Sequence, residues 1–364
     1  SAEERQERVS RMAKLVSEAM RAIMISTPLV RFHQRIDIVK HKREIREAFE
    51  GYQYGACMPG GTENITWLAR VCWDHGIPFV QSDVPNGFPG ANLKQVYDAV
   101  SAIIPSMLPS FLRWCEHGYE VFGQDGYLLD CVVGGMPQGD PLIPIFFGAL
   151  MVHKMKLTEA FLEGMGGQAG DQQATAKALA LFFADDGFMA HPQPQVALAY
   201  RKHFQGQLAS KDDVYAHSGQ TRAECEADLV AAGFDPADVR IVCRDFSSDW
   251  SDEEQAQARA GGGASVPVGV KCLGVPVGNA AFVEKFVRRA AQGDKREDEG
   301  SANSALDNVE NLGCLLADDA QERLLLLRHC IATKLTHLAR FSSAELFEQV
   351  TARLQDAIEQ DIRA

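Results

Sequence analysis

The sequence lacks a long hydrophobic run, although 46% of its 364 residues are hydrophobic. No stretch approaches about 18 uninterrupted apolar residues, so we expect no transmembrane helix and no membrane partner. No signal-peptide pattern is present, and the first residue is Ser rather than Met, so we expect a fragment or a processed piece of something longer. The length and the apolar content predict a large core divided into two or three subdomains.

Cysteine patterns typical of metal modules are also missing. The nine cysteines are an odd number and include no C-x-x-C pair, which argues against a zinc module. Scattered thiols favour a reducing compartment, so we expect an intracellular protein of the nucleus or cytoplasm. The sequence shows no endonuclease, zinc-knuckle or RNase H pattern, and nothing in it indicates an oligomeric state.

Positive charge is scarce, because the net charge is −13. At face value this argues against a nucleic-acid partner. However, residues 212–254 hold twelve acids and three arginines, a net of −9 that leaves −4 for all other residues. Residues 31–47 carry six basic groups against three acids. We expect residues 212–254 to project away from a cleft that residues 31–47 line. Five of the six basic side chains of 31–47 would either contact phosphates in that cleft or belong to a solvated charged helix: Arg31, Arg35, Lys40, Lys42 and Arg43.

Hydrophobic periodicity and turn residues predict an α+β protein. The expected helices cover 1–24, 62–72, 92–118 with breaks at Pro105 and Pro109, 142–155 and 316–364. The expected strands cover 78–84 and 127–133, and the expected hairpins cover 178–190 and 268–278. In the first hairpin, the apolar arms are expected to meet at Asp186-Gly187, a strong turn signal.

The stretch LFFADDGF, residues 181–188, places two acids inside an apolar run. Two like charges about 4 Å apart repel by about 4 kcal/mol at an effective dielectric near 20 unless a cation neutralises them. Hard divalent cations suit such carboxylates, although Asp-Asp-Gly is also ordinary turn chemistry. Asp83 ends the strand predicted at 78–84. If the strands are neighbours, Asp83, Asp185 and Asp186 would hold two Mg²⁺ ions for in-line phosphoryl transfer.

The order of QSDVPNGFPGANL (81–93), GGMPQGDPLIP and then FADD resembles the palm of reverse transcriptases, most closely the non-LTR (LINE-like) retrotransposon type. GTENITWLARV resembles the fingers segment of that family, KCLGVPVG its primer-grip hairpin, and 317–341 its thumb, so the resemblance covers about 50–345. It implies a right-hand polymerase fold. The N-terminal helix and fingers would cover 1–77, the palm 78–280 with 212–254 as an acidic insertion, and a helical thumb or connection 281–364.

The resemblance also implies an activity and site residues. The chain would be an RNA-directed DNA polymerase that binds an RNA template, a DNA primer and dNTPs. Asp83, Asp185 and Asp186 would bind two Mg²⁺ ions, for which Mn²⁺ could substitute; the role of Asp186 varies more across the family. The resemblance places Gln138 and Gly139 under the template and the incoming nucleotide. It makes Lys211 a proton donor to pyrophosphate and Phe88 a gate that excludes the ribose 2′-hydroxyl.

Several features depart from the family. RFHQRIDIVKHKR lacks the usual Arg-Pro-Ile-like pattern, and LASKDDVY replaces an Asn-x-x-Lys-Thr-like block. Phe88 is alternatively a core aromatic, and PQGDP a strand-to-helix turn capped by Asp140. A decayed or domesticated copy that keeps the fold as a scaffold, or as a nucleic-acid-binding protein, is a second hypothesis. An RNA-templated RNA polymerase is a third, which the PQGDPL block disfavours.

Overall fold

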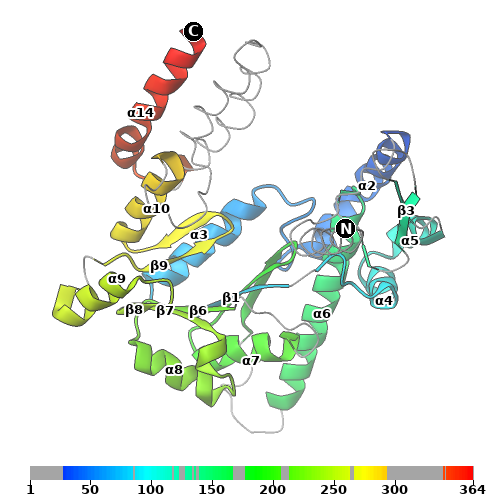
Figure 1. Ribbon diagram of the computed structural model, residues 1–364. Coiled ribbons are helices and arrows are strands. Elements are labelled where there is room, and N and C mark those ends of the chain that lie inside the picture. The colour runs from blue at the N-terminus through cyan, green and yellow to red at the C-terminus, as the bar shows by residue number, and fades with distance from the viewer. Residues whose placement is uncertain are drawn as a thin grey trace, which may run out of the picture. The chain divides into compact units, whose positions relative to one another are not determined.

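The computed structural model describes eleven stretches of the chain and shows a mixed α+β protein (Figure 1). The described residues are 28–84, 87–116, 119–122, 128–132, 135–136, 139–166, 177–205, 213–262, 266–292, 339–340 and 342–363. Within these stretches, no helix combines the length and the apolar character that crossing a membrane requires. The helix expected at 1–24 and the region 316–338 lie outside the described residues.

The chain divides into two compact units, each described here by itself. Unit 1 is formed by described residues within 1–65, 82–189 and 196–212, and unit 2 by those within 66–81, 190–195 and 213–364. Unit 1 holds α2 (Pro28–Phe49), α4 (Leu93–Ile103), η1 (Pro105–Met107), α5 (Leu108–Glu116), β2 (Tyr119–Phe122), β3 (Leu128–Val132), α6 (Ile143–Gly166), β4 (Leu179–Phe183), β5 (Asp186–Ala190, except its last residue) and most of α7 (Pro194–Gln205).

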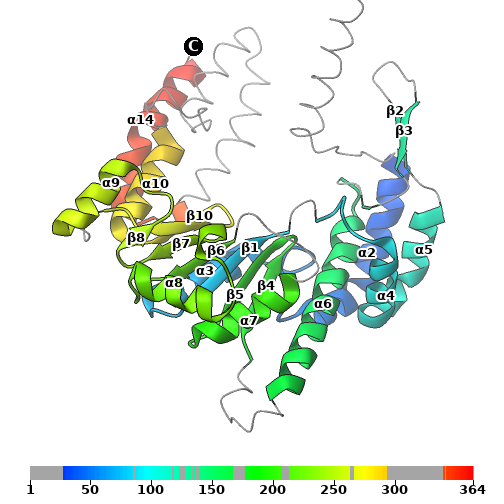
Figure 2. The same ribbon diagram turned by 60° about the horizontal axis from the view of Figure 1, so that its bottom comes forward.

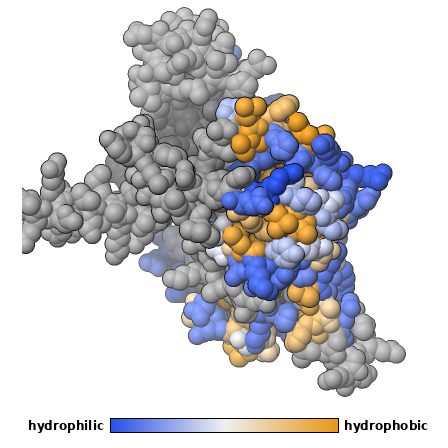
Figure 3. Space-filling model, turned by 90° about the vertical axis from the view of Figure 1, so that its right-hand side faces the viewer, coloured by the Kyte–Doolittle hydropathy of each residue, from blue (hydrophilic) through white to orange (hydrophobic). Residues whose placement is uncertain are grey.

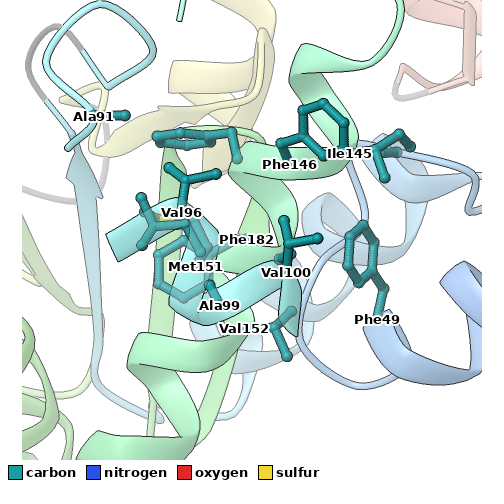
Figure 4. Close-up of a cluster of buried hydrophobic side chains, with 14 of the residues drawn as sticks. Phe49, Ala91, Val96, Ala99, Val100, Ile145, Phe146, Met151, Val152 and Phe182 are labelled. Atoms are coloured by element: carbon teal, nitrogen blue, oxygen red, sulfur yellow. The ribbon is translucent and has the colours of Figure 1, made fainter. Parts of the chain in front are cut away.

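The core of unit 1 lies between its helices and the β4–β5 hairpin. Figure 4 shows buried side chains of α4 meeting those of α6, with Phe49 from α2 and Phe182 from β4 in the same cluster. Phe146 packs edge-to-face on Phe111 of α5, with ring centroids 5.1 Å apart. This cluster supports the hairpin from beneath, because Phe182 is fully buried in it.

Local chemistry explains where α4, α5 and α6 begin and end. The Asn92 side chain caps α4 by accepting from the Lys94 and Gln95 amides, and α4 ends just before Pro105. The helix break expected at Pro109 is absent. Pro109 lies in the first turn of α5, where the backbone N–H that proline lacks would have no partner within the helix. Helix α6 continues to Gly166, well beyond the expected end at residue 155.

Unit 2 contains most of α3 (Gly61–Asp74) and strands of a six-stranded sheet whose order is β4-β5-β1-β6-β7-β8. Strand β1 (Phe79–Asp83) pairs antiparallel with β6 (Val214–His217), so that Phe79 lies opposite Ala216. Strand β6 pairs parallel with β7 (Arg240–Cys243), and β7 antiparallel with β8 (Phe246–Ser247). Unit 2 also contains α8 (Arg222–Ala231), the 3-10 helix η3 (Pro236–Asp238), α9 (Asp252–Gln257) and the short π-helix η4 (Ala258–Gly262).

The acidic residues 212–254 therefore do not form a projecting segment, as the charge pattern had suggested. They supply three strands of the sheet, and Tyr215 is fully buried. Several of the acids have local structural roles: Glu224 forms the capping box of α8, Asp228 accepts from the Tyr215 hydroxyl at 3.1 Å, and Asp249 pairs with Arg240. Charge content alone did not reveal that the strands of this segment are almost entirely buried.

The expected hairpin at 268–278 is present. Strand β9 (Gly269–Cys272) pairs antiparallel with β10 (Val275–Gly278), and Leu273 and Gly274 form the turn with φ of 48° and 83°. Helices α10 (Ala280–Gln292) and α14 (Ala344–Arg363) follow and pack on each other through a small cluster that includes Val283 and Val287. The described part of the tail is thus helical, as predicted.

Candidate functional site

The β4–β5 hairpin carries the two adjacent acids, as predicted, but its turn is placed differently. The turn residues are Ala184 and Asp185, and Ala184 takes a positive φ of 55°. Asp186 and Gly187 belong to β5 and not to the turn, so the expected Asp-Gly turn is wrong. Figure 2 shows the two strands of this hairpin side by side. We use the name acidic turn for residues 184–186, that is, the two turn residues together with Asp186, the first residue of β5.

The end of β1 lies directly beside the acidic turn. The Val84 amide donates to the Asp185 carbonyl at 3.2 Å, and a side chain on Gly187 would come within 2.9 Å of the Ser82 hydroxyl. These two contacts set an antiparallel register in which Asp83 lies across from Asp186. The structure therefore brings together the backbone of all three acids that the sequence singled out, and each acid is half-buried.

Three glycines surround the acidic turn and permit its close packing. A Cβ added to Gly55 would lie 2.4 Å from the Ala184 nitrogen. A Cβ added to Gly87 would lie 2.9 Å from the Phe147 ring and 3.2 Å from the Asp185 Cβ. At Gly187 it would lie 2.9 Å from Phe182. Atoms cannot approach this closely without a shift of the backbone or a ring, so glycine is required by space at these positions.

Residues 52–55 form a segment beside β4 that the sequence did not indicate, with Gln53 in a parallel bridge to Phe182. The Phe182 amide donates to the Tyr52 carbonyl at 2.6 Å, and the Tyr54 amide donates to the Phe182 carbonyl at 2.7 Å. Between them, the Gln53 side chain accepts from the Ala184 amide at 2.9 Å and donates to the Ala184 carbonyl at 3.2 Å. The pattern GYQYG is typical of a glycine-rich turn, and only the strand-like Tyr-Gln-Tyr alternation could have indicated this role.

The same segment is tied to α6 through its tyrosine. The Tyr52 hydroxyl donates to Glu159 at 2.8 Å and accepts from Lys177 at 3.0 Å. Burial raises the pKa of Tyr52, and the hydrogen bond to Tyr52 raises the pKa of Lys177, so both groups keep their protons at neutral pH. This network fixes the start of the segment at a point separate from the acidic turn.

Phe88 lies in the loop that follows β1 and is only 9% exposed. Its ring packs on Phe147 of α6 with centroids 4.5 Å apart, and its carbonyl accepts from the Met136 amide at 2.8 Å. The loop of Phe88 therefore contacts the residues just before the PQGDP motif. A packed ring suits both a rigid gate and a core aromatic, so the gate stays a prediction.

The PQGDP motif is described in part. Gly139 has a φ of 110°, a conformation that favours glycine. Asp140 is buried, accepts from the Leu142 amide at 2.9 Å at the start of α6, and binds the Gln34 side chain at 2.7 Å. Asp140 thus supports the turn that leads into α6, but its side chain bonds Leu142, the residue before the helix, and not an amide of the first helical turn. Gln138 and Lys211 lie outside the described residues, and their roles stay predictions.

Helix α2 carries the basic residues of 31–47. The acid Asp37 is buried and is bound by Ser110 at 2.7 Å and Arg113 at 3.0 Å, whereas Arg35, Lys40 and Lys42 are exposed. Phe32 is also exposed, at 64%. Figure 3, which views the molecule from the right-hand side of Figure 1, shows small hydrophobic patches interleaved with hydrophilic ones. Phosphate contact and a solvated helix both stay predictions for this helix.

The donor set suits a hard divalent cation, because three carboxylates supply the oxygen ligands that Mg²⁺ prefers. Half-burial leaves Asp83, Asp185 and Asp186 accessible to water, which Mg²⁺ retains in its coordination shell. In the described stretches, however, no three His, Cys, Asp or Glu side chains already converge as a metal-binding group. The residues fit the ion by chemistry and by backbone placement.

An open pocket of about 760 Å³ lies in unit 2, beside α8 and β7. Its walls are mostly apolar, and the guanidinium of Arg222 lies 4.1 Å from the centre of the Phe246 ring at its edge. None of the predicted site residues lines this pocket.

No family model matches the chain, and no curated protein sequence matches it. One solved structure that matches is telomerase from Candida albicans in a complex with a fragment of telomeric RNA. The likeness has a TM-score of 0.37 and an identity of 11%, covers 92% of this chain, and spans 51% of the telomerase chain, about half its length. At this TM-score it supports neither a particular family nor an activity, and nothing in the comparisons supports the LINE-like type.

Proposed function

We propose that the chain is an RNA-directed DNA polymerase with a right-hand polymerase fold of the non-LTR retrotransposon type. It would extend a primer 3′-hydroxyl with dNTPs on an RNA template. The observation that supports this function is the hydrogen bond from the Val84 amide to the Asp185 carbonyl, because it brings Asp83 to the acidic turn. Three carboxylates at adjoining strand ends suit a two-metal site, one arrangement that performs phosphoryl transfer between nucleotides.

Asp83, Asp185 and Asp186 would hold two Mg²⁺ ions, with Mn²⁺ as a substitute. The bound ions supply positive charge that polarises the attacking and leaving oxygens of an in-line displacement. The carboxylates orient that charge, and the loop around Phe88 shapes the space next to it. Gly139 and Gln138 would contact the template and incoming nucleotide, and Lys211 would donate a proton to the departing pyrophosphate.

The remaining assignments of the fold belong to the same proposal. Fingers would lie within 1–77, the palm within 78–280 and the thumb within 281–364. Template and primer would be gripped through phosphates and stacked bases. Exposed Arg35, Lys40 and Lys42 are candidates for phosphate contact, so binding is expected to weaken as salt rises.

A primer-extension assay on poly(rA)/oligo(dT), first with Mg²⁺ and then with Mn²⁺, tests the function. Wild type should add dTMP residues, Asp83→Asn should not, and Asp98→Asn should match wild type because Asp98 is an exposed residue of α4. A chain that binds primer–template but extends it with neither ion supports the scaffold hypothesis and contradicts the polymerase. Extension with ribonucleotides alone supports the RNA-templated RNA polymerase.

A further inference from the structure

We infer that Gln53 is a positioning residue that holds the acidic turn in the conformation that binds a divalent cation. The inference rests on the proposed function, because it concerns the same three carboxylates. Gln53 itself touches neither metal nor substrate; it acts on Asp185 through the backbone of Ala184.

The Gln53 side chain makes hydrogen bonds to the Ala184 backbone that a neighbouring strand would otherwise make. Its Oε1 accepts from the Ala184 amide at 2.9 Å and from the Gly55 amide at 2.8 Å, while its Nε2 donates to the Ala184 carbonyl at 3.2 Å. Gln53 is 1% exposed, so water does not compete for these bonds. One amide thus satisfies both backbone groups of a single turn residue.

Ala184 requires such support because its backbone is unfavourable for an alanine. Its φ of 55° lies in the left-handed region, which glycine adopts readily but which L-residues other than Asn and Asp rarely adopt. Without an outside partner, the turn would relax toward other conformations and carry Asp185 with it. Gln53 supplies the partner from one side, and Val84 binds the next residue, Asp185, from the other.

Held from both sides, the backbone of the acidic turn is fixed, so that only its side chains have to move for the carboxylates to converge on a cation. Ligands must keep their geometry within about 0.5 Å to bind a metal well, and residues that lock the backbone supply that order. A turn released from Gln53 keeps its two carboxylates, Asp185 and Asp186, but loses the fixed backbone that sets their spacing from Asp83. The expected consequence is weaker cation binding without loss of the fold.

The test compares Gln53→Met with Tyr52→Phe in the full chain. Gln53→Met keeps the side-chain size and removes all three polar contacts, whereas Tyr52→Phe removes the neighbouring hydroxyl contacts to Glu159 and Lys177 without touching Ala184. Both variants should lower the melting temperature. Mn²⁺ alone is titrated into each protein and followed by electron paramagnetic resonance of the free ion, and exchange of the Ala184 amide hydrogen is measured alongside.

Gln53→Met should weaken Mn²⁺ binding at least tenfold and accelerate exchange at Ala184, while Tyr52→Phe should stay within twofold of wild type in both measurements. Equal Mn²⁺ affinity in the two variants overturns the inference. If wild type still extends primers in that case, the proposed function stands without it. A wild-type chain that binds no Mn²⁺ contradicts the inference and the metal site together.

Discussion

Hairpin β9–β10 turns through Leu273 and Gly274, whereas hairpin β4–β5 turns through Ala184 and Asp185. Both turns open with a non-glycine residue at positive φ, 48° in the first and 55° in the second. In β9–β10 the next residue is a glycine at 83°, and two residues with positive φ match the twist of the strands. In β4–β5 the second position is an acid, and contacts from outside the hairpin hold the turn.

The two turns are stabilised in different ways. A turn that uses glycine is stable by local geometry and carries no reactive group. The second residue of the acidic turn is Asp185, and the turn is held by hydrogen bonds from Gln53 and Val84 and by close packing against Gly55. Both turns contain a left-handed residue, and a left-handed residue that is held by contacts from outside its own hairpin, as Ala184 is, is typical of functional sites.

The largest expected effect comes from Asp185→Asn, which removes the carboxylate and keeps the turn. We expect primer extension to fall by about 10³-fold, equivalent to about 4 kcal/mol of transition-state stabilisation. The melting temperature should change little, because the contacts of the Ala184 and Asp185 backbone remain. Single-turnover extension rates for wild type and Asp185→Asn give the ratio, with Asp98→Asn as the control of equal charge change; similar rates in all three would show that Asp185 is only a turn residue.

Phe88→Ala shows whether a ring next to the acidic turn serves selectivity or stability. A core aromatic should cost about 3–5 kcal/mol of unfolding free energy and lower dNTP and rNTP incorporation together. A gate should instead admit ribonucleotides while the protein still folds and uses dNTPs. Val277→Ala, a fully buried position in the other hairpin, is the matched core variant. An unchanged dNTP/rNTP ratio with a melting temperature that falls as in Val277→Ala refutes the gate.

Gly55→Ala and Gly274→Ala sharpen the comparison between the hairpins. The first places a Cβ 2.4 Å from the Ala184 nitrogen, and we expect a loss of about 1–3 kcal/mol in stability because backbone must move. The second adds strain at a φ of 83°, with a loss of about 1–2 kcal/mol. Only Gly55→Ala should also reduce extension. Denaturant unfolding with parallel extension assays measures both, and equal loss of activity in the two variants would remove the distinction.

The smallest expected effect is that of Ala184→Gly. Relief of the left-handed alanine gains about 1–2 kcal/mol, and the greater freedom of glycine in the unfolded chain offsets about 0.5–1 kcal/mol of it. Stability should therefore rise by no more than about 1.5 kcal/mol, and extension should persist because Gln53 still binds the backbone. A stability loss above about 2 kcal/mol in chemical denaturation would mean that the Ala184 side chain supports the core.

Much of the acidic site could be predicted from the sequence because its signals are local. Asp83 at a strand end and two acids in an apolar hairpin follow from alternation and turn residues. The position of the turn could not be predicted, since Asp186-Gly187 is the better local turn, yet Gly187 is needed inside β5 where the Ser82 hydroxyl approaches. Gln53 was missed because its partner lies 131 residues away.

The fold of the acidic residues 212–254 could likewise not be predicted from local sequence. The charge of this segment was evident, but the burial of Tyr215 between partner strands depends on pairing with β1, more than a hundred residues earlier. Charge reports composition, whereas register depends on distant partners.

The central claim is that Asp83 and the acidic turn together bind the divalent cations. Crystals of the chain with primer–template and a non-extendable dNTP, soaked in Mn²⁺, test it most directly through an anomalous difference map. We expect a Mn²⁺ peak between the carboxylates of Asp83 and Asp185, and no such peak in crystals of Asp83→Asn. A map in which the nucleotide is bound and Mn²⁺ lies elsewhere, with the two carboxylates more than about 8 Å apart, would contradict it.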